Sequence, residues 1–235
     1  MKKTFVIILL VLFTTKYGIA EEYHFVSIKN LIEQEVGRLI IPEIYKKLGM
    51  KVTITPMPGK RAQHSATKGK KDGEIMRIWT YGEENPTTIR VPTPYYYLET
   101  MAFIKKDSGI VIQSKSDLAK YKLVKVRGVK HTNNITKGID AHDLNSTEQM
   151  MKFLAAGRAD VALTNTVDGL IVLKELGITN IIPIQKPLAV LDLYNYIHED
   201  HKDLVPKVDA VIKEMKASGE LSRIIKDAEK QIIGQ

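Results

Sequence analysis

Three side chains at two-residue spacing, Arg77, Trp79 and Tyr81, follow a short apolar stretch that is typical of a β-strand. A guanidinium can hold a carboxylate through two parallel hydrogen bonds, and an indole ring can form the floor of a pocket by stacking. We therefore expect a ligand contact here, with Arg77 as the preferred anchor. Two alternatives stay open, because Arg77 could instead pair with Glu74 or Glu99, and Trp79 could belong to the core.

The ends of other predicted strands supply further candidates, because open α/β sheets bind ligands at the carboxyl ends of their strands. These candidates are Asn30, Arg127, His131, Thr132 and Asn165, with Lys29 and Asn133 beside them. Arg127 is either a ligand contact or a solvated side chain. The candidates come from separate parts of the chain, so the fold has to bring them together.

Enzymatic and metal chemistry have little support. The sequence contains no G-x-S-x-G, H-E-x-x-H or phosphate-loop pattern, and it has no cysteine for a nucleophile, a disulfide or a thiolate metal site. His198 and His201 lack an obvious third metal ligand. Acid–base chemistry by His131 with Asp143 or Glu148 is the enzymatic alternative. We predict no catalytic residue, no metal and no cofactor.

The elements that must position these residues alternate between strand and helix. Apolar residues at helical spacing over 31–48 lie between extended stretches at 23–28 and 51–57. A helix opened by proline is predicted over 58–68, and a third strand over 74–79. The order β-α-β-α-β is typical of a parallel sheet with crossover helices.

A second α/β block follows a proline-punctuated segment, and two helices then close the chain. Strands are predicted at 97–105, 123–126, 161–163, 181–185 and 188–196, and helices at 116–120, 147–156 (capped by Thr147), 168–176, 203–218 and 221–232. The long stretches at 97–105 and 188–196 suit two crossings between lobes. We therefore place one lobe at 21–98 with 194–235 and the other at 99–193, with hinge strands at the borders.

Three consecutive tyrosines, Tyr95, Tyr96 and Tyr97, begin the first crossing. Side chains alternate between the two faces of a strand, so at least one of the three is expected to face the cleft or the hinge. The sequence does not decide which one it is, and Tyr95 is retained as the candidate.

The first twenty residues have the three-part pattern of a secretory signal. Lys2 and Lys3 precede an apolar run at 5–13, and residues 18–20 form a small-x-small cleavage site. The run is too short to span a hydrocarbon core of ~30 Å. We predict cleavage after Ala20 and a periplasmic location, with an uncleaved membrane anchor as the alternative.

The formal net charge is +8, and three of these charges, Lys2, Lys3 and Lys16, belong to the predicted leader. The mildly basic remainder lacks a basic face interleaved with aromatic residues, so we expect no nucleic-acid partner. The absence of cysteine rules out a lipid anchor at a lipobox. We expect a monomer.

Five segments in this order resemble the type II periplasmic solute-binding proteins, in particular family 3, the amino-acid-type ABC transporter substrate-binding proteins. The segments are 60–73, 89–95, 126–128, 153–161 and 201–220, and the most specific is Leu154-Ala155-Ala156-Gly157-Arg158-Ala159-Asp160. The resemblance covers essentially the whole mature chain. It implies an α/β, two-lobed periplasmic binding protein type II fold, in which each lobe is a mixed sheet flanked by helices and two hinge crossings join the lobes.

The resemblance also implies a function. Hinge bending closes the lobes around a small-molecule ligand, and a membrane partner reads the closed form. We therefore predict a periplasmic solute-binding protein that delivers a small polar or anionic ligand, of the amino-acid or organic-acid class, to a membrane permease of an ABC transporter. The alternatives are a ligand-sensing subunit for a membrane kinase or cyclase, and a small periplasmic lyase or dehydratase.

Two stretches depart from the family pattern. Amino-acid binders carry T-x-x-R after the third strand, where this chain has Tyr81-Gly82-Glu83-Glu84 and hence no arginine. They also carry an aspartate for the α-ammonium group, where this chain has Asn165. An amide cannot neutralise a cation as a carboxylate does, so we expect a small anionic or polar organic ligand rather than a plain α-amino acid.

Overall fold

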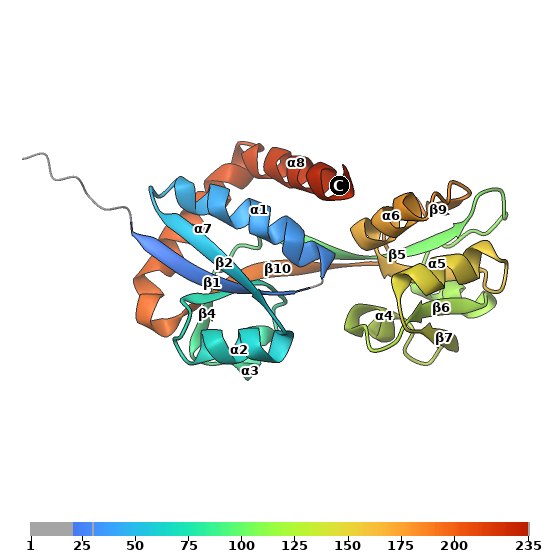
Figure 1. Ribbon diagram of the computed structural model, residues 1–235, viewed down its shortest axis with the longest axis horizontal. Coiled ribbons are helices and arrows are strands. Elements are labelled where there is room, and N and C mark those ends of the chain that lie inside the picture. The colour runs from blue at the N-terminus through green and yellow to red at the C-terminus, as the bar shows by residue number, and fades with distance from the viewer. Residues whose placement is uncertain (1–20, 30, 235) are drawn as a thin grey trace, which may run out of the picture.

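The structure is a computed structural model that describes residues 21–29 and 31–234 (Figure 1). The predicted leader and the candidate Asn30 lie outside the described residues. Over residues 21–29 and 31–234, no helix combines the length and the apolar character that crossing a membrane requires.

The described residues form ten strands. They are β1 (Glu22–Ile28), β2 (Lys51–Met57), β3 (Gly73–Arg77), β4 (Thr88–Arg90), β5 (Tyr96–Lys105), β6 (Leu123–Val126), β7 (Ala141–Leu144), β8 (Val161–Asn165), β9 (Ile181–Pro183) and β10 (Ala189–His198). The strand order is β2-β1-β3-β10-β5-β8-β6-β7, while β4 pairs with β10 and β9 with β5 off this path. The sheet is mixed, because β5 and β10 run antiparallel to their neighbours and β1, β2 and β3 are parallel to one another.

Helices cover this sheet on both sides (Figure 1). The α-helices are α1 (Ile32–Lys46), α2 (Gly59–Thr67), α3 (Tyr81–Glu84), α4 (Lys130–Ile135), α5 (Thr147–Ala155), α6 (Thr166–Glu175), α7 (Val205–Ala217) and α8 (Glu220–Gly234), and the 3-10 helices are η1 (Lys115–Lys120) and η2 (Glu199–Leu204). The predicted β-α-β-α-β order of the first third is confirmed.

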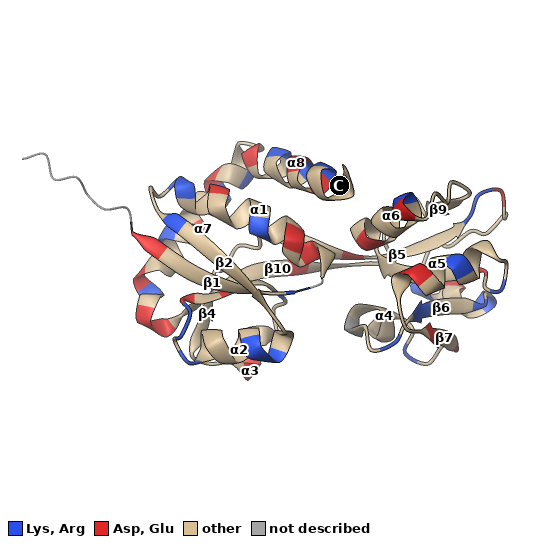
Figure 2. Ribbon diagram, in the orientation of Figure 1, with Lys and Arg blue, Asp and Glu red and all other residues tan. Residues whose placement is uncertain are grey.

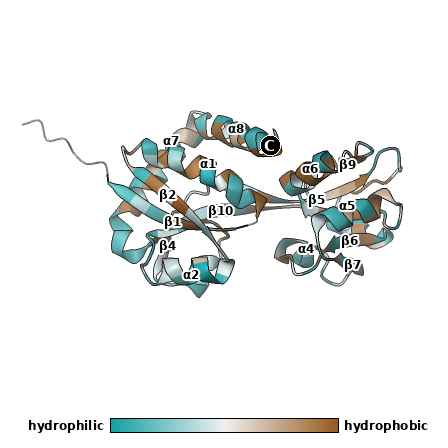
Figure 3. Cartoon of the chain, viewed as in Figure 1, coloured by the Kyte–Doolittle hydropathy of each residue, from teal (hydrophilic) through white to brown (hydrophobic). Residues whose placement is uncertain are grey.

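Most helices form because one side is apolar, as the colouring in Figure 3 shows. In α1, Val36, Ile40 and Ile44 recur at helical spacing and are fully buried. The chain turns after α1 at Gly49, whose φ of 69° is a conformation that glycine adopts without steric cost. Hydrophobic periodicity is therefore enough to define this helix from sequence.

Two separate hydrophobic cores divide the molecule into two lobes. The lobe 1 core includes Phe25, Ile41 and Ile212, which come from β1, α1 and α7. The lobe 2 core includes Phe103 and Leu154, from β5 and α5. Figure 1 shows the two lobes side by side with β5 and β10 passing between them, so the predicted two-lobed α/β fold class is confirmed.

The two crossing strands change partners as they pass between the lobes. Ala189–Leu193 of β10 pairs with Tyr96–Thr100 of β5, and from Tyr194 onward β10 pairs with β3 and β4. The segment Thr100–Ile104 of β5 pairs with β8. Each lobe is therefore built partly from chain that also belongs to the hinge.

Several local features differ from the sequence prediction. The short elements α3, β4, α4 and β7 lie in stretches where no helix or strand was predicted. The N-cap of α5 is Ser146, whose side chain accepts a hydrogen bond from the Gln149 N–H, so the prediction of Thr147 as the cap is wrong. The Thr147 hydroxyl instead donates to Asp168, a contact that only the folded chain creates.

The close approach of β3 to β10 gives a test of the fold. A Cβ at Gly73 would collide with the Tyr196 carbonyl oxygen and lie 2.8 Å from the Phe25 ring. Gly73→Ala should therefore lower the free energy of unfolding by about 2 kcal/mol or more in urea denaturation. Gly59→Ala is the control, because its Cβ would make only ordinary contacts with Ile28, the nearest at 3.7 Å. Equal stability of the two variants would contradict this β3–β10 packing.

Candidate functional site

Two arginines flank β10 in lobe 1. Arg77 ends β3 and lies opposite Tyr194, whereas Arg90 ends β4 and lies opposite Tyr196. A strand has two hydrogen-bonding edges, and β3 and β4 occupy opposite edges of β10 here. Two guanidinium groups from distant parts of the sequence are thereby placed around one short segment.

Arg77 compensates a buried acid. The Glu74 side chain is fully buried, its Oε2 accepts a 2.7 Å hydrogen bond from the Tyr81 hydroxyl, and its Oε1 lies 3.6 Å from Arg77 Nε. The Arg77 guanidinium also lies 4.2 Å from the centre of the Tyr81 ring. Burial raises the pKa of Glu74, while Arg77 and Tyr81 oppose that rise. The structure thus realises the alternative in which Arg77 pairs with Glu74.

Arg90 carries a charge that no acid compensates. In the part of the chain that the structure describes, no carboxylate lies within ion-pair distance of it, and its buried Nε has no hydrogen-bond partner. The guanidinium lies 3.0 Å from the centre of the Trp79 ring and 5.2 Å from that of Tyr194. Stacking and a 3.5 Å hydrogen bond from Nη1 to the Trp79 carbonyl therefore fix the position of this cation, while no carboxylate of the described residues neutralises its charge.

Trp79 presents its ring to solvent. The side chain is 52% exposed, so the alternative of core packing is wrong for this residue. Its backbone carbonyl accepts a 2.7 Å hydrogen bond from the Tyr196 hydroxyl, and its ring packs edge-on against Tyr194. The loop after β3 is thus held in place by β10, and the indole remains accessible to a ligand.

The facing side of lobe 2 contains His131 and Asn165. His131 Nδ1 lies 2.8 Å from Thr100 Oγ1, and Thr100 is paired with Asn165 across β5 and β8. Burial lowers the pKa of His131 to about 4, so the imidazole is neutral near pH 7. The side-chain oxygen Oδ1 of Asn165 caps α6 by accepting hydrogen bonds from the Val167 and Asp168 N–H groups.

Four other predicted residues occupy positions that are less favourable for contact with a ligand. Tyr81 is buried, and its hydroxyl donates to Glu74. Tyr95 is almost completely buried and its hydroxyl accepts a hydrogen bond from the Met76 N–H, so its side chain belongs to the lobe 1 core and does not reach a ligand surface in this structure. Thr132 is also buried and donates to the Val129 carbonyl. Arg127 is exposed, and its backbone N–H donates to Leu144.

The proposed acid–base pairs are not assembled. Asp143 binds the Lys125 ammonium and Glu148 binds Lys152, while His131 contacts Thr100. The other histidines raised as metal ligands contact single acids, His198 with Asp200 and His201 with Asp72.

The lobe 1 and lobe 2 groups lie at opposite ends of the β5–β10 pairing. That pairing runs from Tyr96 and Leu193 to Thr100 and Ala189, which is four residue steps. At ~3.3 Å per residue the two groups are separated along the strands by about 13 Å. A change in the angle between the lobes at this pairing changes the distance between Arg77, Arg90 and Trp79 on one side and His131 on the other.

The comparisons with known proteins agree with this architecture. The sequence profile of the family described as bacterial extracellular solute-binding proteins, family 3, matches residues 35–228. The chain therefore belongs to this family, as its sequence motifs predicted. An uncharacterized protein of Shewanella oneidensis is 25% identical over 195 residues, which cover 80% of this chain and 73% of that protein.

Solved structures share the fold at low sequence identity. An ancestral cationic amino acid solute-binding protein is 16% identical, with 89% of this chain and 96% of that chain covered and a TM-score of 0.70. A histidine kinase sensor domain similar to periplasmic binding proteins is 17% identical over 88% of this chain and 96% of its own, with a TM-score of 0.64. An amino acid ABC transporter substrate-binding protein of Streptococcus pneumoniae, bound to L-arginine, is 19% identical over 90% and 96% of the two chains, with a TM-score of 0.59.

Sequence reasoning missed Arg90 and the two tyrosines that position it. The triplet Ile89-Arg90-Val91 alternates apolar, polar and apolar residues, which is a short strand signal with the arginine on the opposite face. The signal is obscured by the prolines on both sides. Tyr194 and Tyr196 show the same alternation along β10, but only the pairing with β3 and β4 places them beside Arg77 and Arg90.

The pairing of Arg77 with Glu74 predicts a pH-dependent stability change. Arg77→Met leaves the buried Glu74 carboxylate uncompensated, so the free energy of unfolding should fall by about 1 to 3 kcal/mol at pH 8. Without Arg77 the pKa of Glu74 rises further, and the folded protein takes up a proton more readily than the unfolded chain. The loss should therefore shrink as the pH is lowered to 5, because a protonated Glu74 carries no charge.

The double variant Glu74→Gln/Arg77→Met is the matched control, because it removes both charges and keeps an acceptor for the Tyr81 hydroxyl. Urea unfolding at both pH values should show that it recovers most of the stability at pH 8. A loss in Arg77→Met that is the same at pH 5 and pH 8 would contradict the pairing.

Proposed function

We propose that this protein captures a small anionic or polar organic ligand between its two lobes, with Arg90, Arg77 and Trp79 as the lobe 1 contacts. The observation that supports this most is the uncompensated Arg90 cation, whose buried N–H has no partner and which stacks on an exposed tryptophan. A guanidinium that no carboxylate neutralises suits an acidic ligand group, because hydrogen bonds between two charged groups are stronger than those between neutral ones.

In this proposal, lobe 2 closes over the ligand by bending at β5 and β10. His131 faces the site as a neutral imidazole, so it offers hydrogen bonding without repelling or attracting charge. Asn165, Arg127 and the segment around Thr132 approach from the same lobe. The lobe boundaries that fit this motion are 21–98 with 194–235 for lobe 1 and 99–193 for lobe 2.

Two classes of ligand are candidates, an organic acid or other small anion and an amino acid. Similar structures are described as binding cationic amino acids or L-arginine, which need carboxylates for their amino and guanidino groups. In lobe 1 the Glu74 carboxylate is buried and paired with Arg77 and Tyr81, so it is not free for such groups. We therefore favour an organic acid or another small anion, and retain an amino acid as the second candidate because of the neighbours' ligands.

The location and the partner follow from family membership. We propose that the chain is exported to the periplasm and acts as a monomer that delivers its ligand to a membrane permease. A histidine kinase sensor domain among the structural neighbours supports ligand sensing as the alternative. In the view of Figure 2, acidic and basic residues are interspersed over both lobes, which gives no reason to propose a nucleic-acid partner.

A titration panel tests the ligand proposal. Calorimetry of the wild-type protein against amino acids, small organic acids and short peptides should show tight binding of an acid. Arg90→Met should weaken that binding about tenfold or more, because one charge-assisted hydrogen bond to a ligand is lost. Arg223→Met, an exposed arginine on α8, is the control and should leave the affinity unchanged. Tight binding of a zwitterionic amino acid that is unaffected by Arg77→Ala and Arg90→Met would contradict the proposal.

A further inference from the structure

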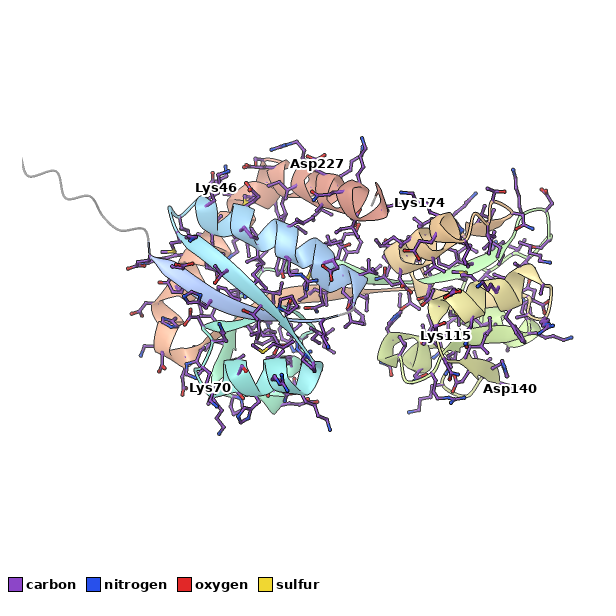
Figure 4. The ribbon with its side chains drawn as sticks, in the orientation of Figure 1. Lys46, Lys70, Lys115, Asp140, Lys174 and Asp227 are labelled. Atoms are coloured by element: carbon purple, nitrogen blue, oxygen red, sulfur yellow. The ribbon has the colours of Figure 1, made fainter. Side chains whose placement is uncertain are left out.

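Besides the crossing strands β5 and β10, the helices α6 and α8 also connect the two lobes. This contact lies away from the cluster of Arg77, Arg90 and Trp79. Lys174 of α6, in lobe 2, donates a 2.8 Å hydrogen bond from Nζ to the carbonyl oxygen of Ile233 in α8, which belongs to lobe 1. Figure 4 labels Lys174 at the end of α8 that faces lobe 2. A lysine ammonium at a helix C-terminus also interacts favourably with the negative end of the helix dipole.

Hydrogen bonds from the hinge strand β5 reach both helices of this contact. The Tyr96 hydroxyl donates 2.9 Å to Glu229 of α8, and Glu99 accepts from the Thr166 hydroxyl at the start of α6. Tyr96 and Glu99 are three residues apart on the same crossing strand. Any change in the twist of β5 therefore changes the relative position of α6 and α8.

A small pocket, partly open to solvent, lies beside these groups. It has a volume of about 100 Å³ and is bounded by residues of β5, α6 and α8. The lining includes Tyr97, Glu99, Leu170, Glu229 and Ile233. The lining also includes Val167, so apolar side chains of α6 and α8 lie beside the polar bonds that join the two helices to each other and to β5.

The position of this contact relative to the hinge gives it a mechanical role. Figure 1 shows α6 and α8 on one side of β5 and β10, and α2 and α4 on the other side. A rotation about the crossing strands that brings α2 toward α4 must move α8 away from α6. The Lys174–Ile233 bond can therefore form only over part of the range of lobe angles.

We propose that the contact between α6 and α8 is a latch that holds the ligand-free lobes apart, and that closure over a ligand requires the Lys174–Ile233 bond to break. The latch rests on the hinge bending of the proposed function but not on the identity of the ligand. It makes the affinity for any ligand depend on a residue that does not touch it, because part of the binding free energy is used to open the latch.

The chain has no cysteine, so two introduced cysteines can be spin-labelled selectively. Lys70→Cys and Asp140→Cys place labels at exposed positions on the two lobes, both along the lower edge of Figure 4. Double electron–electron resonance spectroscopy on the ligand-free protein should give mainly one long distance between the two spin labels. Adding Lys174→Met should raise the population at shorter distances about fivefold, because one hydrogen bond of the open state is lost. Lys174→Arg should keep the long distance.

Lys230→Met is the matched control, because it removes an exposed lysine from α8 and should leave the distances unchanged. Identical distance distributions for Lys174→Met and the wild-type protein would overturn the latch, and so would an equal change in Lys230→Met. Neither result bears on the ligand proposal, which the Arg90→Met titration tests without any distance measurement.

Discussion

The pairing of β10 with three other strands is the constraint on which the rest of the structure depends. Its first half pairs with β5, and its second half is held between β3 and β4. The change of partner falls between Leu193 and Tyr194, and the register shifts again before Tyr196. The same strand therefore closes the lobe 1 sheet, provides the hinge and fixes the arginines that flank it. This point borders the lobe 1 core, which includes Leu193 and Tyr96.

Charge compensation explains why the two arginines differ although they lie beside the same strand. Glu74 is buried and needs a cation, and Arg77 supplies it together with the Tyr81 hydroxyl. Arg90 has aromatic neighbours and no acid among the described residues, so its charge is available to a ligand. The preference for Arg77 as the anchor was reasonable from spacing alone. The sequence does not show that Glu74 is buried three residues earlier and pairs with Arg77.

The sequence predicted the fold well because the fold depends on local patterns. The predicted helix at 31–48 is observed as α1, and the predicted strand at 51–57 is observed with the same bounds. The short elements α3, β4, α4 and β7 were missed because three to six residues carry too little periodicity. Tyr95 was misplaced because alternation alone does not say which face of a strand is buried. Arg90 was missed because its role comes from pairing with a strand more than a hundred residues away.

The most direct test of the account is a crystal structure of the protein purified from its exported form without unfolding, examined for a bound small molecule between the lobes. The account predicts an acidic group of that molecule in contact with the guanidinium of Arg90, a planar part against Trp79, and α6 separated from α8. A molecule bound between the lobes that leaves Arg90 stacked and unpartnered, with the Lys174–Ile233 bond intact, would contradict it.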